Sequence, residues 1–371
     1  MDHTLKYFFL IAAAVVASGG VSAQKSAPIT SAFQSDIDSQ VSESIPGILA
    51  AVVSKDRNID WSGASGYSCK ESRAALLPGQ TFRIASVTKT FVATAILRLW
   101  EEGKLQLEDP IAKYISPEHV EILKQGGYAP QKITVLHLLT HSSGLSEHTQ
   151  TDKFKLPYMR TNHVWTRTEQ LQDLVTFSKP VGEIGKQFYY SDSGYILLGE
   201  IVEAITHKSL GEAIAELLDF KKLGLQNTHM EDAKGEFGTE RIHQYFEGED
   251  IYFINPTLDL YGGGGLLSSV HDLSLFYQCL FENKVFRNEA TLAKMLTPVS
   301  YPAKQALDYR IGIWEIEIDG MKAYTHSGFW GTQVVYIPSI KAGIAVNYSQ
   351  RWENKGIAPV IPIIVKRLME K

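Results

Sequence analysis

The sequence has little of what marks several large protein classes. Only Cys69 and Cys279 occur in 371 residues, too few for a disulfide framework, and we expect two separate buried thiols. The formal net charge is −5 and basic residues do not cluster, which argues against a nucleic-acid partner. No HExxH pair is present and no Gly-Lys-Ser/Thr follows the glycines at 262–265, so neither a metalloprotease nor a phosphate-binding loop is indicated. We therefore expect no metal or cofactor.

Long apolar runs are also absent, with one exception at the N-terminus. Lys6 precedes YFFLIAAAVVA, and SGGVSA then ends in the small-x-small pattern of a cleavage site after Ala23. A run of about a dozen apolar residues is shorter than the roughly 20 that a membrane-spanning helix needs, although an anchor is the alternative. We expect residues 1–23 to be a removed signal peptide, which makes the protein secreted or periplasmic with no integral membrane segment.

What the chain does contain is two kinds of periodicity. Residues 45–68 predict two strands joined at a polar turn, and the period-two stretches at 311–318, 321–328, 332–339 and 343–350 predict further antiparallel strands, with Asp319-Gly320 as a hairpin turn. The region between reads as helical pieces broken by turns. We expect an α/β (α+β) fold: residues 24–106 and 262–371 form a sandwich domain whose antiparallel sheet uses both chain ends, and 107–261 form a mostly helical inserted domain.

One stretch carries candidate catalytic chemistry. TFRIASVTKTF places Ser86 and Lys89 in a Ser-x-x-Lys spacing, followed by the helix-like run VATAILRLWEEG. Both side chains would face the same way. A serine hydroxyl needs a base to become a nucleophile, and a lysine can serve if burial lowers its pKa. Alone, this spacing is common on helices and indicates little.

Two later stretches change this interpretation. FYYSDSGYILLG places Tyr190-Ser191-Asp192 before an apolar helix, and YTHSGFWGTQ places His326-Ser327-Gly328 on an edge-like strand. In this order SVTK, YSD and HSG resemble the three motifs of penicillin-recognising serine enzymes. With THSSGL at 140–145 and the glycines before SSVHDL, the chain looks like the branch with class C β-lactamases, DD-peptidases and related serine esterases, across nearly all of the mature chain.

The resemblance implies a role for each matching residue. Ser86 would be the acylated nucleophile, Lys89 its proton partner, and Tyr190 the phenol that passes the proton to the leaving group. The oxyanion hole would use the backbone N–H groups of Ser86 and Phe329. His326, beside Tyr190, would help to place or protonate the substrate.

The same resemblance assigns substrate binding to Asp192, Ser327, Gly328 and Phe329. Asp192 stands where that branch usually has asparagine, and an aspartate accepts hydrogen bonds but cannot donate one to a substrate carbonyl. His326 stands where many β-lactamases have lysine, and a largely neutral histidine holds a carboxylate less firmly. Both departures favour a peptidase or esterase over a β-lactamase.

Other interpretations of the same residues remain open. Ser191-Asp192-Ser193 partly imitates the Ser-Asp-Asn triplet of class A enzymes, in which case Ser191 would be catalytic and Tyr190 a packing aromatic; we prefer Tyr190. Three histidines could bind a metal by spacing, but capping or packing is favoured; they are His137, His141 and His148. Five aromatics either line a pocket or belong to the core: Tyr252, Phe253, Trp314, Phe329 and Trp330.

The sequence thus predicts an exported serine hydrolase that forms an acyl-enzyme on Ser86. Its expected substrates are D-amino-acid peptides of cell-wall type or small esters. The alternatives are a class C-like β-lactamase, a penicillin-binding sensor without turnover, and a lipid-active esterase. The expected partner is a small-molecule or peptide substrate, and the sequence does not indicate the oligomeric state.

Overall fold

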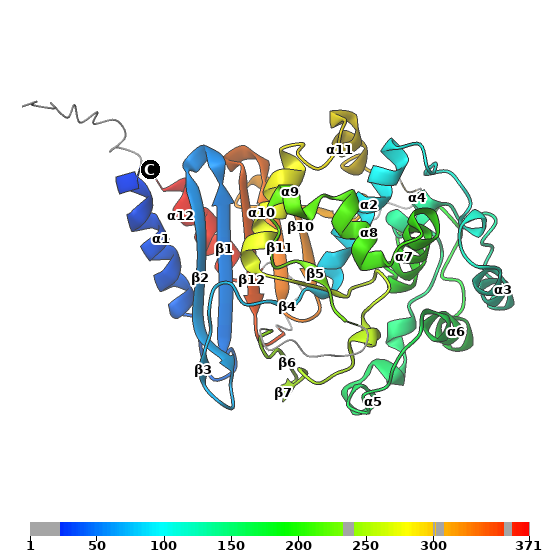
Figure 1. Cartoon of the computed structure of the whole chain (residues 1–371), viewed down its shortest axis with the longest axis horizontal. Helices are drawn as coiled ribbons and strands as arrows, with labels where there is room; N and C mark the ends of the chain where they lie inside the picture. Colours follow the sequence, from blue (N-terminus) through cyan, green and yellow to red (C-terminus); the bar gives the residue numbers. More distant parts are fainter. Residues whose placement is uncertain (1–22, 233–240, 300, 302–307, 352–357, 371) are drawn as a thin grey trace, which may run out of the picture.

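A seven-stranded antiparallel sheet built from both ends of the chain forms the centre of the fold (Figure 1). This computed structural model describes residues 23–232, 241–299, 301, 308–351 and 358–370. The strand order is β3-β2-β1-β12-β11-β10-β9. The strands of this sheet and of two smaller sheets, β4-β8-β5 and β6-β7, are β1 Gly47–Ser54, β2 Ile59–Cys69, β3 Ala74–Ala75, β4 Phe82–Arg83, β5 His229–Met230, β6 Tyr245–Phe246, β7 Glu249–Asp250, β8 Leu266–Ser268, β9 Trp314–Ile318, β10 Met321–Gly328, β11 Thr332–Ile337 and β12 Ala342–Tyr348.

Helices cover both faces of this sheet. In Figure 1, α1 and α12 lie on one side, and α10, α2 and the remaining helices lie on the other. The α-helices are α1 Ala23–Asp38, α2 Thr88–Glu101, α3 Pro117–Gln125, α4 Val135–Leu139, α5 Leu156–Met159, α6 Arg167–Phe177, α7 Asp192–Thr206, α8 Leu210–Leu217, α9 Phe220–Leu223, α10 Val270–Phe281, α11 Glu289–Met295 and α12 Val360–Met369. The fold is therefore the mixed α/β arrangement that the sequence predicted.

The two faces of the sheet give two hydrophobic cores. One joins α1 and α12 to the sheet through Phe33, Ile37 and Ile364, among others. The other contains α2 and α10, where Phe91 stacks on Phe276 with ring centroids 3.9 Å apart. Because β1 is apolar on both faces, all eight of its residues are buried. An alternating strand would have left one face exposed to solvent.

The turn chemistry read from the sequence explains the hairpins. Asp319 and Gly320 both have positive φ, at 49° and 74°, and connect β9 to β10. This conformation suits a two-residue turn with glycine second. The strand predicted from residue 311 begins at Trp314, and the short three-stranded sheet β4-β8-β5 was not predicted.

The helical region lies between α2 and β8, as predicted, although β5, β6 and β7 interrupt it. Its division into a separate domain stays a prediction. The expected cleavage segment lies outside the described residues apart from Ala23, which begins α1. Within the described ranges, no helix combines the length and apolar character required to cross a bilayer.

Candidate active site

Ser86 sits where a tight turn leads into α2, a helix of the second core. A 3₁₀ turn covers Ala85–Val87 and α2 follows at Thr88. Ala85 has a positive φ of 44°, which is rare for a residue with a side chain and often occurs at functional sites. The Ser86 side chain is half-buried, whereas Lys89, one turn further, is completely buried. The nucleophile predicted from sequence therefore lies on a turn that leaves its side chain partly accessible to solvent.

A glycine brings the third motif against this turn. A Cβ on Gly328 would lie 2.1 Å from the carbonyl oxygen of Ile84. Only glycine allows β10 to approach the backbone just before the serine so closely. Beyond Thr325, β10 also loses its partner β9, because their register covers only Met321–Thr325 of β10. The expected edge-like strand is therefore internal in its first part and does not pair with β9 from His326 to Gly328.

Lys89 connects the first motif to the second. Its Nζ donates to Ser86 Oγ at 2.8 Å and to the Gly263 carbonyl at 2.6 Å, and it forms an ion pair with Asp192. Burial lowers the pKa of Lys89, but the Asp192 carboxylate outweighs it, so the pKa lies above its ordinary value. The condition under which Lys89 would act as a base, a pKa lowered by burial, is therefore not met at rest, because the Asp192 carboxylate favours the protonated lysine.

Tyr190 lies over the same lysine. The Lys89 Nζ is 5.0 Å from the centroid of its ring. Burial raises the pKa of Tyr190 to about 12, opposed by the Lys89 charge. The phenol is therefore protonated at rest, and any phenolate must form during the reaction beside the lysine. His141, also buried, lies against Tyr190 with ring centroids 4.3 Å apart and a 33° tilt between the rings, and burial keeps the pKa of His141 well below its ordinary value.

Ser191, the catalytic residue of the competing alignment, points elsewhere. Its Oγ donates to the Ser146 carbonyl at 2.7 Å, and its backbone N–H donates to His141 Nδ1 at 3.1 Å. These bonds fix the turn that presents Tyr190. Ser191 is fully buried and does not line the cavity described below, whereas Tyr190 does. The geometry favours Tyr190 as the group that acts on Ser86.

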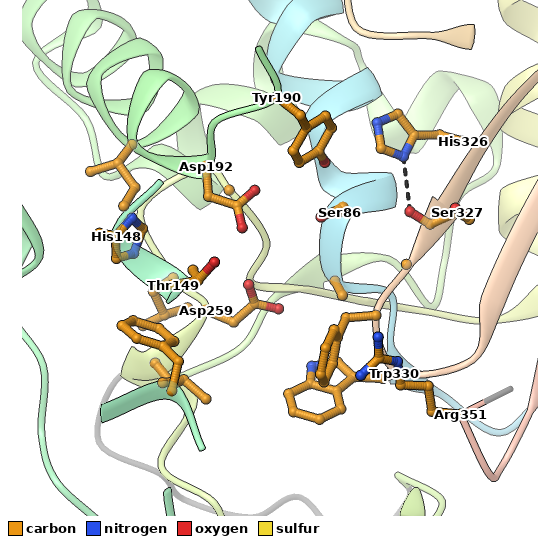
Figure 2. Close-up of a pocket in the computed structure, with 18 of the residues that line it drawn as sticks. Ser86, His148, Thr149, Tyr190, Asp192, Asp259, His326, Ser327, Trp330 and Arg351 are labelled. Carbon is orange, nitrogen blue, oxygen red and sulfur yellow. Dashed lines mark hydrogen bonds between the residues drawn. The ribbon is translucent and has the colours of Figure 1, made fainter. Parts of the chain in front are cut away.

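His326 is buried on β10 with its Nδ1 2.9 Å from the Ser327 carbonyl (Figure 2). Its ring centroid is 6.5 Å from that of Tyr190. Burial and then the Lys89 charge lower the pKa of His326 to about 3. At neutral pH it is therefore an uncharged hydrogen-bonding group and a poor proton donor to a substrate.

All eight residues predicted for the site except Lys89 line one cavity of about 440 Å³. Figure 2 shows the carboxylates of Asp192 and Asp259 on one side of Ser86, with His326 and Ser327 on the other. Trp314 and Trp330 also line the cavity, as does Phe329. Tyr252 and Phe253, the other two aromatics considered, are not among its lining residues.

Sequence reasoning missed Asp259, the second carboxylate of the cavity. Burial, and then the neighbouring Asp192 charge, raise the pKa of Asp259 to about 7. A Cβ on Gly264 would lie 2.3 Å from the Asp259 carboxylate oxygens, so this glycine makes room for the carboxylate. The glycine run at 262–265 shapes this part of the site. Its Gly263 carbonyl binds Lys89, and its Gly264 accommodates Asp259.

The other sequence candidates have separate partners. His137 Nδ1 accepts from the Thr134 backbone N–H, and His148 Nδ1 lies 2.9 Å from Ser193 Oγ. With His141 under Tyr190, the three histidines do not form a metal cluster among the described residues. Both cysteines are free, as expected, but Cys69 is only half-buried.

Comparisons with known proteins identify a family and several similar sequences. A family model described as Beta-lactamase matches residues 31–360. Penicillin-binding protein 4* of Bacillus subtilis (strain 168) is 25% identical over 288 residues, which are 71% of this chain and 59% of that protein. The N-acetylmuramyl-L-alanine amidase of the same strain is 27% identical over 371 residues, 88% of this chain and 80% of that protein. The chain thus spans less than two thirds of the first relative.

A solved structure extends the comparison to the fold. D-amino acid amidase from Ochrobactrum anthropi SV3, complexed with D-phenylalanine, superimposes with a TM-score of 0.74 at 20% identity. The match covers 92% of this chain and 98% of that one. At this identity the likeness establishes the shared fold.

Proposed function

The chain belongs to the beta-lactamase family, and we propose that it is an exported serine hydrolase that forms an acyl-enzyme on Ser86. Its proposed substrates are D-amino-acid amides and peptides of cell-wall type, or small esters. One observation carries the proposal: the Lys89 Nζ donates to Ser86 Oγ at 2.8 Å, and Ser86 opens into a 440 Å³ cavity. A nucleophile in contact with its proton partner at a cavity is the arrangement that acyl transfer requires.

The charges at rest define the order of proton transfers that we propose. Lys89 begins as an ammonium paired with Asp192, and substrate entry beside Asp192 weakens that pair. Lys89 then loses its proton to solvent and takes the proton of Ser86 Oγ as the Oγ–carbonyl carbon bond forms. Tyr190 gives its proton to the leaving group as the bond between the carbonyl carbon and the leaving group breaks, and Lys89 then returns a proton to Tyr190. In deacylation Lys89 takes a proton from water as the water oxygen bonds to the acyl carbon, and Tyr190 protonates Ser86 Oγ as the Oγ–acyl bond breaks. Lys89 then reprotonates Tyr190 and regains a proton from solvent, which releases the acid and restores the resting site.

The cavity supports a substrate with a cationic group close to the scissile carbonyl. Asp192 and Asp259 place two carboxylates beside Ser86 (Figure 2). A substrate ammonium would offset their mutual repulsion. Free amino-acid amides and esters carry an ammonium one carbon from the carbonyl. The amidase named above, which was crystallised with D-phenylalanine, has the same fold.

The backbone next to Ser86 supports an extended substrate. From His326 to Gly328, β10 has no β9 partner, so its outer backbone groups can pair with a peptide added as a further strand. A peptide in this position would direct its carbonyl toward the predicted oxyanion hole of Ser86 and Phe329, both of which line the cavity.

Intact-mass measurement tests the reaction. The protein is treated with a fluorophosphonate, a penicillin, and the D- and L-forms of an amino-acid p-nitroanilide. We expect fluorophosphonate labelling and faster release of nitroaniline from the D-form. Ser86→Ala should abolish both, while Ser72→Ala on an exposed turn should retain them.

The penicillin result separates the alternatives. A Ser86 adduct that is released quickly would indicate a β-lactamase, and a persistent adduct without nitroaniline release would indicate a sensor. If no reagent modifies Ser86, the acyl-enzyme proposal fails. For export, N-terminal sequencing of the protein secreted by an expressing cell should begin after Ala23, whereas an intact N-terminus would contradict cleavage.

A further inference from the structure

A second group of chemically reactive side chains lies away from the catalytic cavity, where β2 ends. Cys69, Glu71 and His243 each offer one ligand atom, and these atoms all lie within 4.8 Å of one another. None of the three lines the catalytic cavity. Cys69 and His243 are half-buried and Glu71 is exposed, so the cluster is open to solvent.

The spacing of this cluster is close to that of a tetrahedral metal site. Zinc bonds of about 2.3 Å to sulfur and 2.0 to 2.2 Å to nitrogen and oxygen place neighbouring ligand atoms about 3.3 to 3.6 Å apart. The Cys69 Sγ already lies 3.4 Å from Glu71 Oε2. Small rotations of the three side chains would therefore bring their ligand atoms to three corners of a tetrahedron around one zinc ion.

The histidine of the cluster is held in a fixed orientation. Its Nδ1 lies 2.7 Å from Asp250 Oδ2, which leaves Nε2 for a metal. Its ring stacks on Tyr252 with centroids 4.2 Å apart at 15°. A carboxylate on the second ring nitrogen is the usual partner of a metal-binding histidine, because it sets the tautomer and the direction of the free nitrogen.

The carboxylate ligand is oriented in the same manner. The Tyr245 hydroxyl donates to Glu71 Oε2 at 2.8 Å and accepts from the Lys70 backbone N–H at 2.8 Å. Two of the three ligands therefore have a second partner that fixes them before any metal binds.

We propose that Cys69, Glu71 and His243 bind one Zn²⁺ ion, with water in the fourth position. The mixed sulfur, nitrogen and oxygen donors suit zinc, whereas Mg²⁺ and Ca²⁺ prefer oxygen alone. The sequence analysis predicted no metal site because the ligands share no motif: Glu71 and His243 are 172 positions apart (243 − 71). Only the fold brings them together.

Binding would tie the β2 end to a segment that borders the catalytic cavity. Gln244, the residue after His243, donates to the Trp330 carbonyl at 2.8 Å and accepts from the Arg83 backbone N–H at 2.9 Å. Trp330 lines the catalytic cavity. The ion would therefore act as a cross-link that steadies one wall of the cavity, without entering the acyl-transfer chemistry.

Cobalt titration of the purified protein tests this site. The protein is reduced, stripped with a chelator and titrated with Co²⁺, which reports a thiolate ligand through a sulfur-to-metal charge-transfer band. We expect one equivalent to bind, the band to disappear on Zn²⁺ addition, and Zn²⁺ to raise the melting temperature.

Variants of the two cysteines provide the matched comparison. Cys69→Ser and His243→Ala should lose the band, whereas Cys279→Ser, which removes the buried thiol, should keep it. Asp250→Asn should weaken binding about tenfold or more. Fluorophosphonate labelling of Ser86 checks that each variant is folded. A missing band in the wild-type protein, or a band that persists in Cys69→Ser, would overturn the proposal while leaving the acyl-transfer proposal intact.

Discussion

Replacing Asp192 by asparagine tests how the active-site lysine keeps its proton. In the wild-type protein the Asp192 carboxylate raises the pKa of Lys89 against the effect of burial. An adjacent opposite charge typically shifts a pKa by about 1 to 3 units, which corresponds to about 1.4 to 4 kcal/mol. Asparagine keeps the shape but removes the charge. We therefore expect the free-amine fraction of Lys89 near neutral pH to rise about tenfold to a thousandfold.

The pH dependence of kcat/KM for an ester and for an amide of the same acid measures this change. The acidic limb of both profiles should move to lower pH by about 1 to 3 units. The amide should also gain relative to the ester, because the asparagine N–H₂ can donate to a substrate carbonyl.

A stability measurement accompanies the kinetics. The raised pKa of Lys89 means that its ion pair stabilises the fold below the pKa of the unfolded lysine and is lost as pH rises through the folded value. Asp192→Asn should therefore lower the free energy of unfolding at neutral pH. As a control, Asp173→Asn removes a carboxylate 2.8 Å from Lys153, outside the cavity. This variant should leave the pH profiles of kcat/KM for the ester and for the amide unchanged. Equal loss of ester and amide activity with an unshifted acidic limb would refute the reasoning.

Three other changes give further checks. Tyr190→Phe removes the proposed proton shuttle and should lower kcat by about 100- to 10,000-fold while fluorophosphonate still labels Ser86 at a reduced rate; near wild-type turnover would exclude the shuttle. Gly328→Ala places a Cβ 2.1 Å from the Ile84 carbonyl and should cost about 1 to 3 kcal/mol of stability by overpacking, so an unchanged denaturation midpoint would contradict the described approach of β10. Asp259→Asn should raise the melting temperature at pH 8 but have little effect at pH 4. Burial raises the pKa of Asp259 to about 7, so its ionisation costs stability only above the pKa that this residue has in the unfolded chain. A difference in melting temperature that does not depend on pH would count against this.

Local patterns predicted the central sheet and the order of the site motifs. The Asp319-Gly320 turn fixes the β9–β10 hairpin because its φ values require residues that tolerate the left-handed region. The Ser-x-x-Lys spacing predicts neighbouring side chains because one helical turn separates them. Both rest on contacts between residues close in sequence.

The rest of the site depends on contacts that local patterns do not contain. Asp259 follows a short 3₁₀ turn, and nothing nearby in the sequence shows that it lies beside Asp192 in the same cavity. From sequence, Lys89 could act as a base only if burial lowered its pKa, yet the direction of its pKa shift is decided by Asp192, over 100 positions later (192 − 89). The protonation state of a buried group can be inferred only when its distances to other charged groups in the folded chain are known.

The pairing of β1 with β12 also constrains the time at which this protein can fold. Ala51 pairs with Ala345, which is synthesised 294 positions later (345 − 51). At roughly 5 to 20 residues per second, β1 emerges about 15 to 60 s before this partner exists. During that interval the apolar strand GILAAVVS lacks one of its two neighbours, although β2 is available. Early β1–β2 hairpins with an exposed edge are prone to pair with other chains. We therefore expect nascent chains to need a chaperone or slow release more than the finished enzyme does.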